Sequence, residues 1–386
     1  GIGKTMSVLF PALKSMGNES VGPIFYLTAR GTTRTAAENA LAILRDTEPE
    51  LHLRSVTLTA KDKICLCETR ECTPEACPYA NGYYARIKGA LWDVLDVPCL
   101  TAETLQEYAE RHTVCPFELG LDSSLWSDVI IGDYNYLFDP VVHLVRFFES
   151  AGDYIFLVDE AHNLPGRARE MHSAALTKTS FYEAKKLLGK GKSSLKNALT
   201  KVNDVFIEWR HRAEEETAAR DGRFFLKERS EEFDHLLNRL CEPLEAWLDD
   251  HREPDETHTA LLQLYFDVRA WLRVADTFDD HFVLQITASG SEVRAAQLCL
   301  DPSAFLADSF ALGRAAVLFS ATLAPASYYK DLCGVPEARA VALRSPFPAG
   351  NQGLFCIGNV STRYKDRDAS LAIVEESLAT MVRARC

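Results

Sequence analysis

The chain has 386 residues, of which 47% are hydrophobic and 25% charged, and its formal net charge is −13. These values are typical of a soluble globular protein with more than one packed unit, and they argue against a surface coated in basic patches. No apolar run of about 18 residues is present, so no membrane-spanning helix is predicted. No signal peptide is visible, and we expect a cytoplasmic protein.

Short apolar segments alternate with helical segments along much of the chain. Strands are predicted at 23–28, 55–60, 129–132, 154–158 and 316–319. Their short length and their β-branched and aromatic residues are typical of buried strands in a parallel sheet. Helices are predicted over 33–46 and over most of 83–112. This alternation predicts an α/β fold with a doubly wound parallel sheet.

The stretch from Arg167 to Thr277 differs in character, because it is charged and amphipathic and shows no strong strand pattern. Segments 235–250 and 260–278 space their apolar residues as helices do. We therefore expect an all-α insertion here. Strands resume at 282–286 and near 298–300, and we assign them to the parallel-sheet domain.

The first five residues, Gly1-Ile2-Gly3-Lys4-Thr5, match the last part of a phosphate-binding loop. In such loops glycines let backbone N–H groups surround phosphates, and the following helix adds the positive end of its dipole. Lys4 is expected to reach the β- and γ-phosphates of ATP, and Thr5 to hold Mg²⁺. Gly1 and Gly3 complete the candidate nucleotide-binding set.

Asp159-Glu160-Ala161-His162 directly follows five apolar residues of a predicted strand. An acidic residue at the end of such a strand can hold Mg²⁺, which makes Asp159 the second metal candidate. Glu160 is placed to orient or deprotonate the attacking water. His162 can couple this site to a neighbouring motif.

Ser320-Ala321-Thr322 also lies just beyond a predicted strand. Small hydroxyl residues in this place can hydrogen-bond a neighbouring motif and transmit the state of the nucleotide. Ser320 and Thr322 are therefore candidate coupling residues. Taken alone, the same three residues could be a simple helix N-cap.

Eleven cysteines are present, and four of them, Cys65, Cys67, Cys72 and Cys77, fall within thirteen residues. A chain of this size does not need a disulfide framework, so the local cluster indicates a metal site. Four thiolates suit zinc as well as an iron–sulfur cluster, and their spacing does not separate the two metals.

The order G-K-T, D-E-A-H, S-A-T resembles that of superfamily 2 helicases. Lys4 and Asp159 are 155 positions apart, and Asp159 and Ser320 are 161 apart, whereas one βα unit needs only about 30 residues. Two insertions are therefore implied, one with the cysteines and one helical. This arrangement resembles the XPD/DinG family of iron–sulfur DNA helicases, in a bacterial-type form. The resemblance extends over nearly the whole chain.

The resemblance implies a RecA-like P-loop NTPase domain with a [4Fe–4S] cluster domain and an all-α arch inserted into it. The cluster ligands implied are Cys65, Cys72, Cys77 and Cys115. Cys67 departs from the four-cysteine pattern and could replace Cys65 or Cys72. ATP and Mg²⁺ are the other expected cofactors.

Residues for DNA contact are suggested by interleaved basic and aromatic side chains and by the family's motifs, since single strands are held by charge pairing and base stacking. The candidates are Thr28, Arg30, Lys61, Lys63, Tyr84, Arg86, Tyr134 and Tyr136. For each of them, core packing or an ordinary surface charge is the alternative.

The resemblance divides the chain into a first motor domain with two insertions and the start of a second motor domain. The expected parts are 1–60, 121–166 and 279–345 for the motor domain, 61–120 for the cluster domain, 167–278 for the arch and 346–386 for the second motor domain. Segments Leu343–Phe347 and Ser361–Arg367 resemble the crossing into that second domain. The chain is expected to be a truncated fragment with little unwinding activity by itself.

The resulting expectation is an ATP-dependent DNA helicase that binds single-stranded and forked DNA and acts as a monomeric motor in repair or replication. By resemblance its direction of movement is 5′ to 3′. Two other functions stay open: a DNA-binding or redox-sensing iron–sulfur module without productive ATP turnover, and a helicase-related nuclease.

Overall fold

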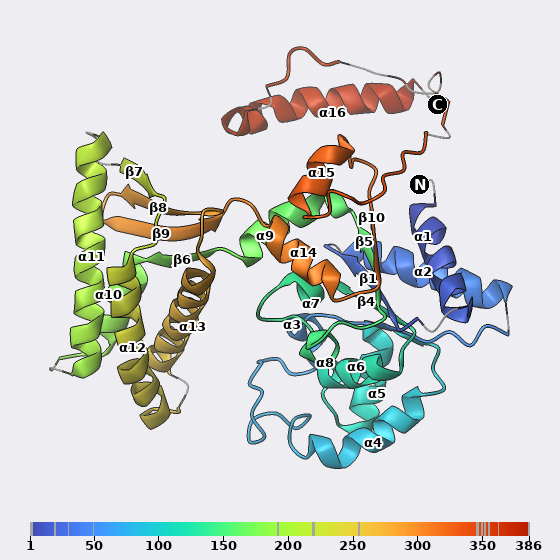
Figure 1. Ribbon diagram of the computed structural model, residues 1–386, viewed down its shortest axis with the longest axis horizontal. Helices are drawn as coiled ribbons and strands as arrows, with labels where there is room; N and C mark the ends of the chain where they lie inside the picture. Colours follow the sequence, from blue (N-terminus) through green and yellow to red (C-terminus); the bar gives the residue numbers. More distant parts are fainter. Residues whose placement is uncertain are drawn as a thin grey trace. The chain divides into compact units, whose positions relative to one another are not determined.

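The computed structural model describes residues 3–18, 21–29, 31–48, 50–190, 193–217, 221–253, 255–344, 347–348, 350, 353, 356–361 and 363–384. It divides into two compact units, one ending at Ala340 and the other beginning at Val341 (Figure 1). Within the described residues no helix is long and apolar enough to cross a membrane.

A six-stranded parallel sheet forms the centre of the first unit, in the order β10-β5-β1-β4-β2-β3 (Figure 1). Its strands are β1 (Ile24–Thr28), β2 (Ser55–Thr57), β3 (Cys99–Leu100), β4 (Val129–Asp133), β5 (Ile155–Asp159) and β10 (Ala315–Phe319). All five neighbouring pairs are parallel. The predicted doubly wound, RecA-like sheet is therefore confirmed.

The two faces of this sheet are buried by different sets of helices, because successive strand residues point to opposite sides. Ile24 and Tyr26 of β1 join a core with α1 (Lys4–Asn18) and α2 (Gly31–Thr47). Phe25 and Leu27 join a larger core on the other face. The elements on that side are α3 (Lys61–Ile64), α4 (Tyr83–Val94), α5 (Ala102–His112), α6 (Pro116–Ser123), α7 (Asn135–Phe138), α8 (Val145–Phe148), α9 (Leu164–Met171) and α14 (Ser303–Ala311).

Short elements complete this part of the chain. They are the 3-10 turns η1 (Ser124–Trp126) and η2 (Ala161–Asn163), and helix α15 (Ala326–Leu332). Helix α5 is capped by Thr101, whose side chain accepts a hydrogen bond from the Thr104 N–H.

One strand differs from expectation in its burial. The segment 316–319 was predicted as a buried strand, but β10 is largely exposed, with Val317 at 41%. The reason is its place in the sheet, because among the described strands β10 pairs only with β5 and lies at the edge.

A second, antiparallel sheet takes two of its four strands, β6 and β7, from the stretch that was predicted to be all helical. Its strands, in the order β6-β9-β8-β7, are β6 (Ala174–Thr177), β7 (Asp221–Leu226), β8 (Phe282–Ser289) and β9 (Glu292–Cys299). The all-α prediction is therefore wrong, and so is the assignment of 282–286 and 298–300 to the parallel sheet. The hairpin β8–β9 turns through Gly290 at a φ of +58°, a backbone geometry that favours glycine.

Four helices pack with this second sheet: α10 (Lys178–Leu187), α11 (Ser194–Thr217), α12 (Glu231–Asp250) and α13 (Glu256–Thr277). The last two confirm the helices predicted from apolar spacing. Phe206, Phe233 and Trp271 form the centre of a separate core there, and all three are fully buried. The described part of the second unit contains η4 (Tyr364–Asp366) and α16 (Arg367–Arg383).

Candidate nucleotide-binding site

The carboxyl ends of several strands bring the predicted motifs to one edge of the parallel sheet. Register pairs Thr28 with Asp133 and Phe319 with Asp159, so Ser320 follows at the same edge. In open α/β sheets this edge is where ligands bind. Residues from distant parts of the sequence can therefore meet here.

Lys4, the first residue of α1, contacts Glu160 at this edge. The Lys4 Nζ lies 3.0 Å from the Glu160 Oε1, and the two side chains are 27% and 26% exposed. Gly3 precedes Lys4 at a φ of +77°, and a Cβ there would meet open space, so backbone conformation rather than crowding favours glycine. Gly1 lies outside the described residues.

Glu160 has a backbone that non-glycine residues rarely adopt, with a φ of 50°. Partial burial acts to raise the pKa of its carboxyl group, but the contacts with Lys4, Ser320 and His162 outweigh burial and lower it. The carboxylate form is therefore favoured. A partly exposed base of this kind can accept a proton or orient a water molecule.

Asp159 is almost fully buried and holds the centre of a hydrogen-bond network. Its Oδ2 accepts a hydrogen bond of 2.6 Å from the Tyr26 hydroxyl, and its Oδ1 accepts one of 2.8 Å from the Glu160 N–H. The Tyr26 hydroxyl also lies 3.4 Å from the Thr5 Oγ1. Tyr26 thus connects Thr5 and Asp159, the two residues predicted to hold Mg²⁺.

Sequence reasoning missed Tyr26, although a signal was present. Its hydroxyl is the single side-chain polar group within the apolar run 24–27 of a buried strand, and buried hydroxyls need a partner. Burial and the hydrogen bond to Asp159 raise the pKa of Tyr26 well above its ordinary value, so the hydroxyl stays protonated and donates.

His162 of the D-E-A-H motif contacts Ser320 of the S-A-T motif. The His162 Nδ1 lies 2.6 Å from the Ser320 Oγ, and that hydroxyl donates to the Glu160 Oε2 at 3.1 Å. A hydroxyl has one hydrogen, so in this arrangement the His162 ring N–H is the donor to Ser320. The Thr322 N–H donates to the Ser320 Oγ at 3.2 Å. The predicted coupling residues therefore lie together with Glu160.

Two of the predicted DNA-contact residues are buried instead. Tyr134 is fully buried, and its hydroxyl donates to the backbone oxygen of Asp159. Thr28 is also fully buried, with its hydroxyl against that of Thr33. Neither side chain has surface for a contact with DNA, so these two predictions are wrong, because Tyr134 packs against Asp159 and Thr28 against Thr33.

The other DNA-contact candidates differ in exposure. Tyr84 is 88% exposed and Lys63 is exposed as well. Lys61 forms an ion pair of 3.4 Å with Glu118, and Tyr136 is half-buried against Gly132, where a Cβ would come within 2.7 Å of its ring. Arg30 lies outside the described residues.

Arg86 joins the cysteine segment to the chain around Cys115. Its guanidinium donates to the carbonyl oxygens of Thr113 at 2.9 Å and Pro78 at 3.0 Å. It also donates to the carbonyl oxygen of Asn81. The guanidinium of Arg86 therefore binds backbone carbonyl groups, whereas the sequence suggested only a contact with DNA.

Five free cysteines could supply thiol ligands to a metal: Cys65, Cys67, Cys72, Cys77 and Cys115. Cys67 and Cys77 approach to 3.9 Å between sulfur atoms, and burial together with the thiols of Cys77 and Cys65 raises the pKa of Cys67 to about 11. Cys115 precedes α6, and Cys72 is exposed. The thiol chemistry fits an iron–sulfur or zinc group. The described residues include no preassembled group of three or more metal-binding side chains.

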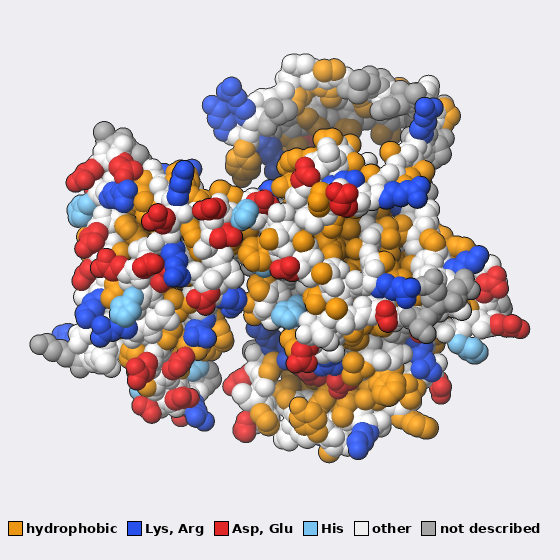
Figure 2. Space-filling view, in the orientation of Figure 1, with side chains coloured by type: hydrophobic (Ala, Val, Ile, Leu, Met, Phe, Trp, Pro, Cys, Tyr) orange, Lys and Arg blue, Asp and Glu red, His pale blue; other side chains and the backbone are white. Residues whose placement is uncertain are grey.

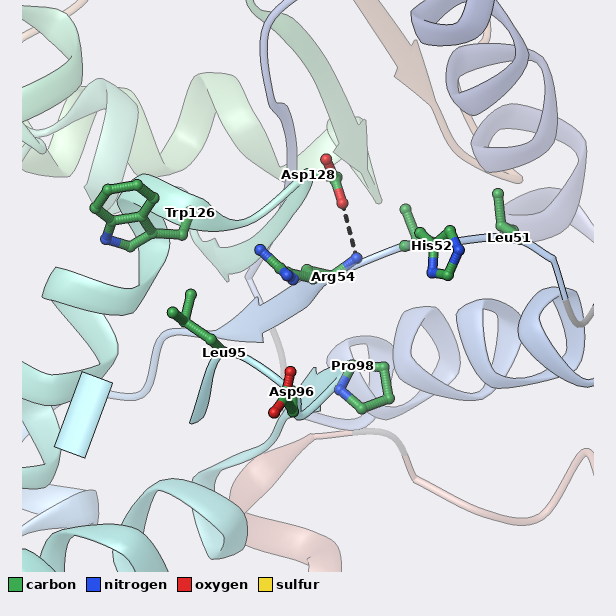
Figure 3. Close-up of a pocket in the computed structure, with 9 residues that line it drawn as sticks. Leu51, His52, Arg54, Leu95, Asp96, Pro98, Trp126 and Asp128 are labelled. Atoms are coloured by element: carbon green, nitrogen blue, oxygen red, sulfur yellow. Dashed lines mark hydrogen bonds between the residues drawn. The ribbon is translucent and has the colours of Figure 1, made fainter. Parts of the chain in front are cut away.

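A surface pocket of about 450 Å³ lies away from these motifs, at the amino-terminal ends of β2 and β4 (Figure 3). Arg54, Trp126 and Asp128 are among its lining residues, and the Arg54 N–H donates to the Asp128 Oδ2 at 2.8 Å. It contains none of the predicted site residues. The pocket is thus separate from the candidate nucleotide site.

Comparison with known proteins identifies helicase relatives. The DEAD_2 family profile matches residues 45–181. The chain is 29% identical over 223 residues to the general transcription and DNA repair factor IIH helicase subunit XPD of Schizosaccharomyces pombe, covering 52% of this chain and 28% of that protein. It is 27% identical over 157 residues to the regulator of telomere elongation helicase 1 homolog of Anopheles gambiae, covering 37% and 16%. The matches span less than a third of these relatives.

Solved structures agree at the level of the fold. A structure described as truncated XPD has a TM-score of 0.53 at 18% identity, covering 87% of this chain and 90% of that one. Another XPD helicase structure has a TM-score of 0.52 at 18% identity, covering 87% and 56%.

Proposed function

Because the chain is an XPD-type member of helicase superfamily 2, we propose that it binds ATP with Mg²⁺ and uses ATP hydrolysis to move along single-stranded DNA. The observation that carries this proposal is the contact between Lys4 and Glu160, residues 156 positions apart. A cation for the phosphates and a carboxylate for the attacking water are groups that ATP hydrolysis needs.

Each residue at the sheet edge has a part in this reaction. Lys4 would neutralise the β- and γ-phosphates, and the carboxylate of Glu160 would orient or deprotonate the attacking water. Thr5 and Asp159 would hold Mg²⁺, which when bound neutralises phosphate charge. Tyr26, whose hydroxyl lies within hydrogen-bond distance of both, would fix their side chains in place.

Coupling of hydrolysis to movement would pass through His162 and Ser320. The Ser320 hydroxyl contacts both His162 and Glu160. A change in the position or charge of the Glu160 carboxylate would therefore alter the hydrogen bonds of the segment after β10. That segment continues along the chain toward the second unit. In this proposal the hydrogen bonds of Ser320 would link the state of the nucleotide to the residues that follow Ser320.

The two insertions would act on the DNA. In our proposal Cys65, Cys72, Cys77 and Cys115 hold a [4Fe–4S] cluster, which when bound ties the irregular cysteine segment to the start of α6 by iron–thiolate bonds. The region formed by the second sheet and helices α10 to α13 would be the arch. Together they would split duplex DNA ahead of a monomeric motor that moves 5′ to 3′ on single-stranded and forked DNA in repair or replication.

The test is unwinding of a forked duplex by the complete protein and by its Lys4→Ala variant, with Lys14→Ala as the control. Lys14 is exposed on the same helix and belongs to no motif. We expect ATP-dependent unwinding by the parent protein and the control, and its loss in Lys4→Ala. Equal unwinding by all three proteins would refute the assigned role of Lys4.

A further inference from the structure

A lysine-rich segment stands out in this acidic chain. Residues 178–201 contain seven lysines and one glutamate, a formal charge of +6, whereas the whole chain carries −13. The segment forms α10 and the first turns of α11, which pack with the second sheet. None of its residues belongs to the nucleotide site or to the predicted DNA contacts.

Helix α10 has one apolar face and one basic, aromatic face. Phe181 and Ala184 are buried in the core of this region. Tyr182 is 58% exposed, and Lys178 and Lys186 lie four positions before and after it, on the same side of the helix. An exposed ring between two cations offers a face on which a base can stack while the cations meet phosphates.

The charges of four of these lysines are not neutralised by carboxylates of the described residues. In the described part of the chain, Lys185, Lys186, Lys190 and Lys201 form no ion pair, whereas farther along α11 the basic residues do, as Arg212 does with Glu216 at 2.8 Å. The positive field over this surface is therefore available to an external anion.

A groove lies between α11 and α12. Its volume is about 500 Å³, and Lys201, Arg239, Ser194 and Asn197 line it together with one carboxylate, that of Glu242. In Figure 2, Lys and Arg side chains gather near the end of α11 where the helix begins. Cations, a hydroxyl and an amide are the groups that contact phosphate and sugar oxygens in nucleic-acid complexes.

We propose that the lysine surface, formed by Lys178, Tyr182, Lys185, Lys186, Lys190 and Lys201, binds the sugar–phosphate backbone of DNA. A base stacks on Tyr182 while the lysines neutralise phosphates, the combination by which single strands are held. The choice of DNA as the bound polyanion rests on the proposed function. The surface adds a second contact outside the parallel-sheet domain, which would hold a strand while the motor site turns over.

The experiment measures the affinity of the complete protein for a fluorescent single-stranded oligonucleotide as salt is varied. We expect Lys185→Glu with Lys186→Glu to lower the affinity at low salt by about tenfold or more, and to reduce the slope of log K against log salt by about 1.4, or about 0.7 per lost phosphate contact. Tyr182→Ala should weaken binding by about tenfold with an unchanged salt slope, because stacking involves no counterion release.

The matched control is Lys227→Glu with Arg252→Glu, two exposed residues of the same region that give the same change in net charge. An unchanged slope in the Lys185/Lys186 variant, or an equal loss in the control, overturns the proposal. DNA-independent ATP hydrolysis should stay at the parent level in all variants, which also reports folding. A parent protein that binds DNA through these lysines but hydrolyses no ATP would instead defeat the proposed function alone.

Discussion

The His162 Nδ1 lies 2.6 Å from the Ser320 Oγ, across 158 positions of sequence. The same hydroxyl donates to Glu160, so one small side chain joins the D-E-A-H and S-A-T motifs. A hydrogen bond from one hydroxyl is easy to remove without creating a large cavity. This relationship therefore gives the first prediction.

Ser320→Ala should uncouple unwinding from hydrolysis. Loss of a hydrogen bond to a charged group costs about 1.5–3 kcal/mol, and we expect the lower end because the site is partly exposed, so unwinding per ATP hydrolysed should fall about tenfold. ATP affinity should stay within about twofold of the parent, because Ser320 contacts no residue assigned to the phosphates. Ser320→Thr keeps the hydroxyl and should recover most of the coupling; failure of both variants alike points to packing instead.

Glu160→Gln should separate binding from hydrolysis. The amide cannot accept a proton, so single-turnover hydrolysis should fall by about 10²-fold or more. Lys4 loses its 3.0 Å ion-pair partner, so its charge is free for phosphate, and binding of a fluorescent ATP analogue should be as tight as in the parent or tighter. Glu170→Gln, at an exposed residue of α9, is the control. Hydrolysis at the parent rate in Glu160→Gln would remove this residue from the mechanism.

The pH dependence of hydrolysis should follow Glu160. Its pKa lies below the ordinary glutamate value, so the basic form persists into acid and activity should be lost only as pH falls through that lowered pKa. Ser320→Ala removes a donor to the carboxylate while Lys4 and His162 remain. The acid limb of kcat/KM should therefore move to higher pH in that variant. A shift to lower pH, or none, contradicts the assigned hydrogen bond.

Tyr26→Phe should destabilise the first unit. The hydroxyl donates at 2.6 Å to the nearly buried Asp159, so its removal leaves a carboxylate oxygen without that donor, at a cost of about 1–3 kcal/mol in the free energy of unfolding. Urea denaturation would measure this loss. Tyr328→Phe, at a 52% exposed tyrosine, should change the free energy by less than about 0.5 kcal/mol. Equal midpoints for the two variants would show that the Tyr26 hydroxyl contributes nothing.

Cysteine variants should define the metal site. Serine in place of Cys65, Cys72, Cys77 or Cys115 should lower iron per chain and visible absorbance after anaerobic purification, because each would remove one thiolate ligand. Cys67→Ser should retain the parent iron content, although its sulfur lies 3.9 Å from that of Cys77. Iron loss in Cys67→Ser would move this residue into the ligand set. Zinc without iron in the parent protein would replace the cluster with a zinc site.

The parallel sheet could be predicted from sequence because its strands are short apolar runs that end in polar motif residues. Asp159 and Ser320 each follow such a run, and parallel strands carry their ends to one edge. The proximity of Asp159 and Ser320 follows from this arrangement of parallel strands alone. Tyr26 was missed because a tyrosine in an apolar strand also suits plain core packing, and only the fold brings its hydroxyl to Asp159.

The second sheet could not be predicted because its signals are weak and non-local. β6 is four residues long, and it pairs with a strand more than a hundred positions later in the chain. Between them lie long amphipathic helices that dominate the pattern. Burial of Thr28 and Tyr134 was missed for a related reason. Motif position suggests an exposed residue, whereas the contact of Tyr134 with Asp159 and of Thr28 with Thr33 arises only in the fold.

The most direct test of the central claim is Mg²⁺-dependent ATP hydrolysis by the complete protein, measured with and without single-stranded DNA, beside its Lys4→Ala variant. Our account predicts hydrolysis that DNA stimulates, and a fall in kcat of about 10²–10³-fold in Lys4→Ala, the range found when one charge-stabilising group is removed from a site. A parent protein without ATP hydrolysis, or a Lys4→Ala variant that hydrolyses ATP at the parent rate, would contradict the account.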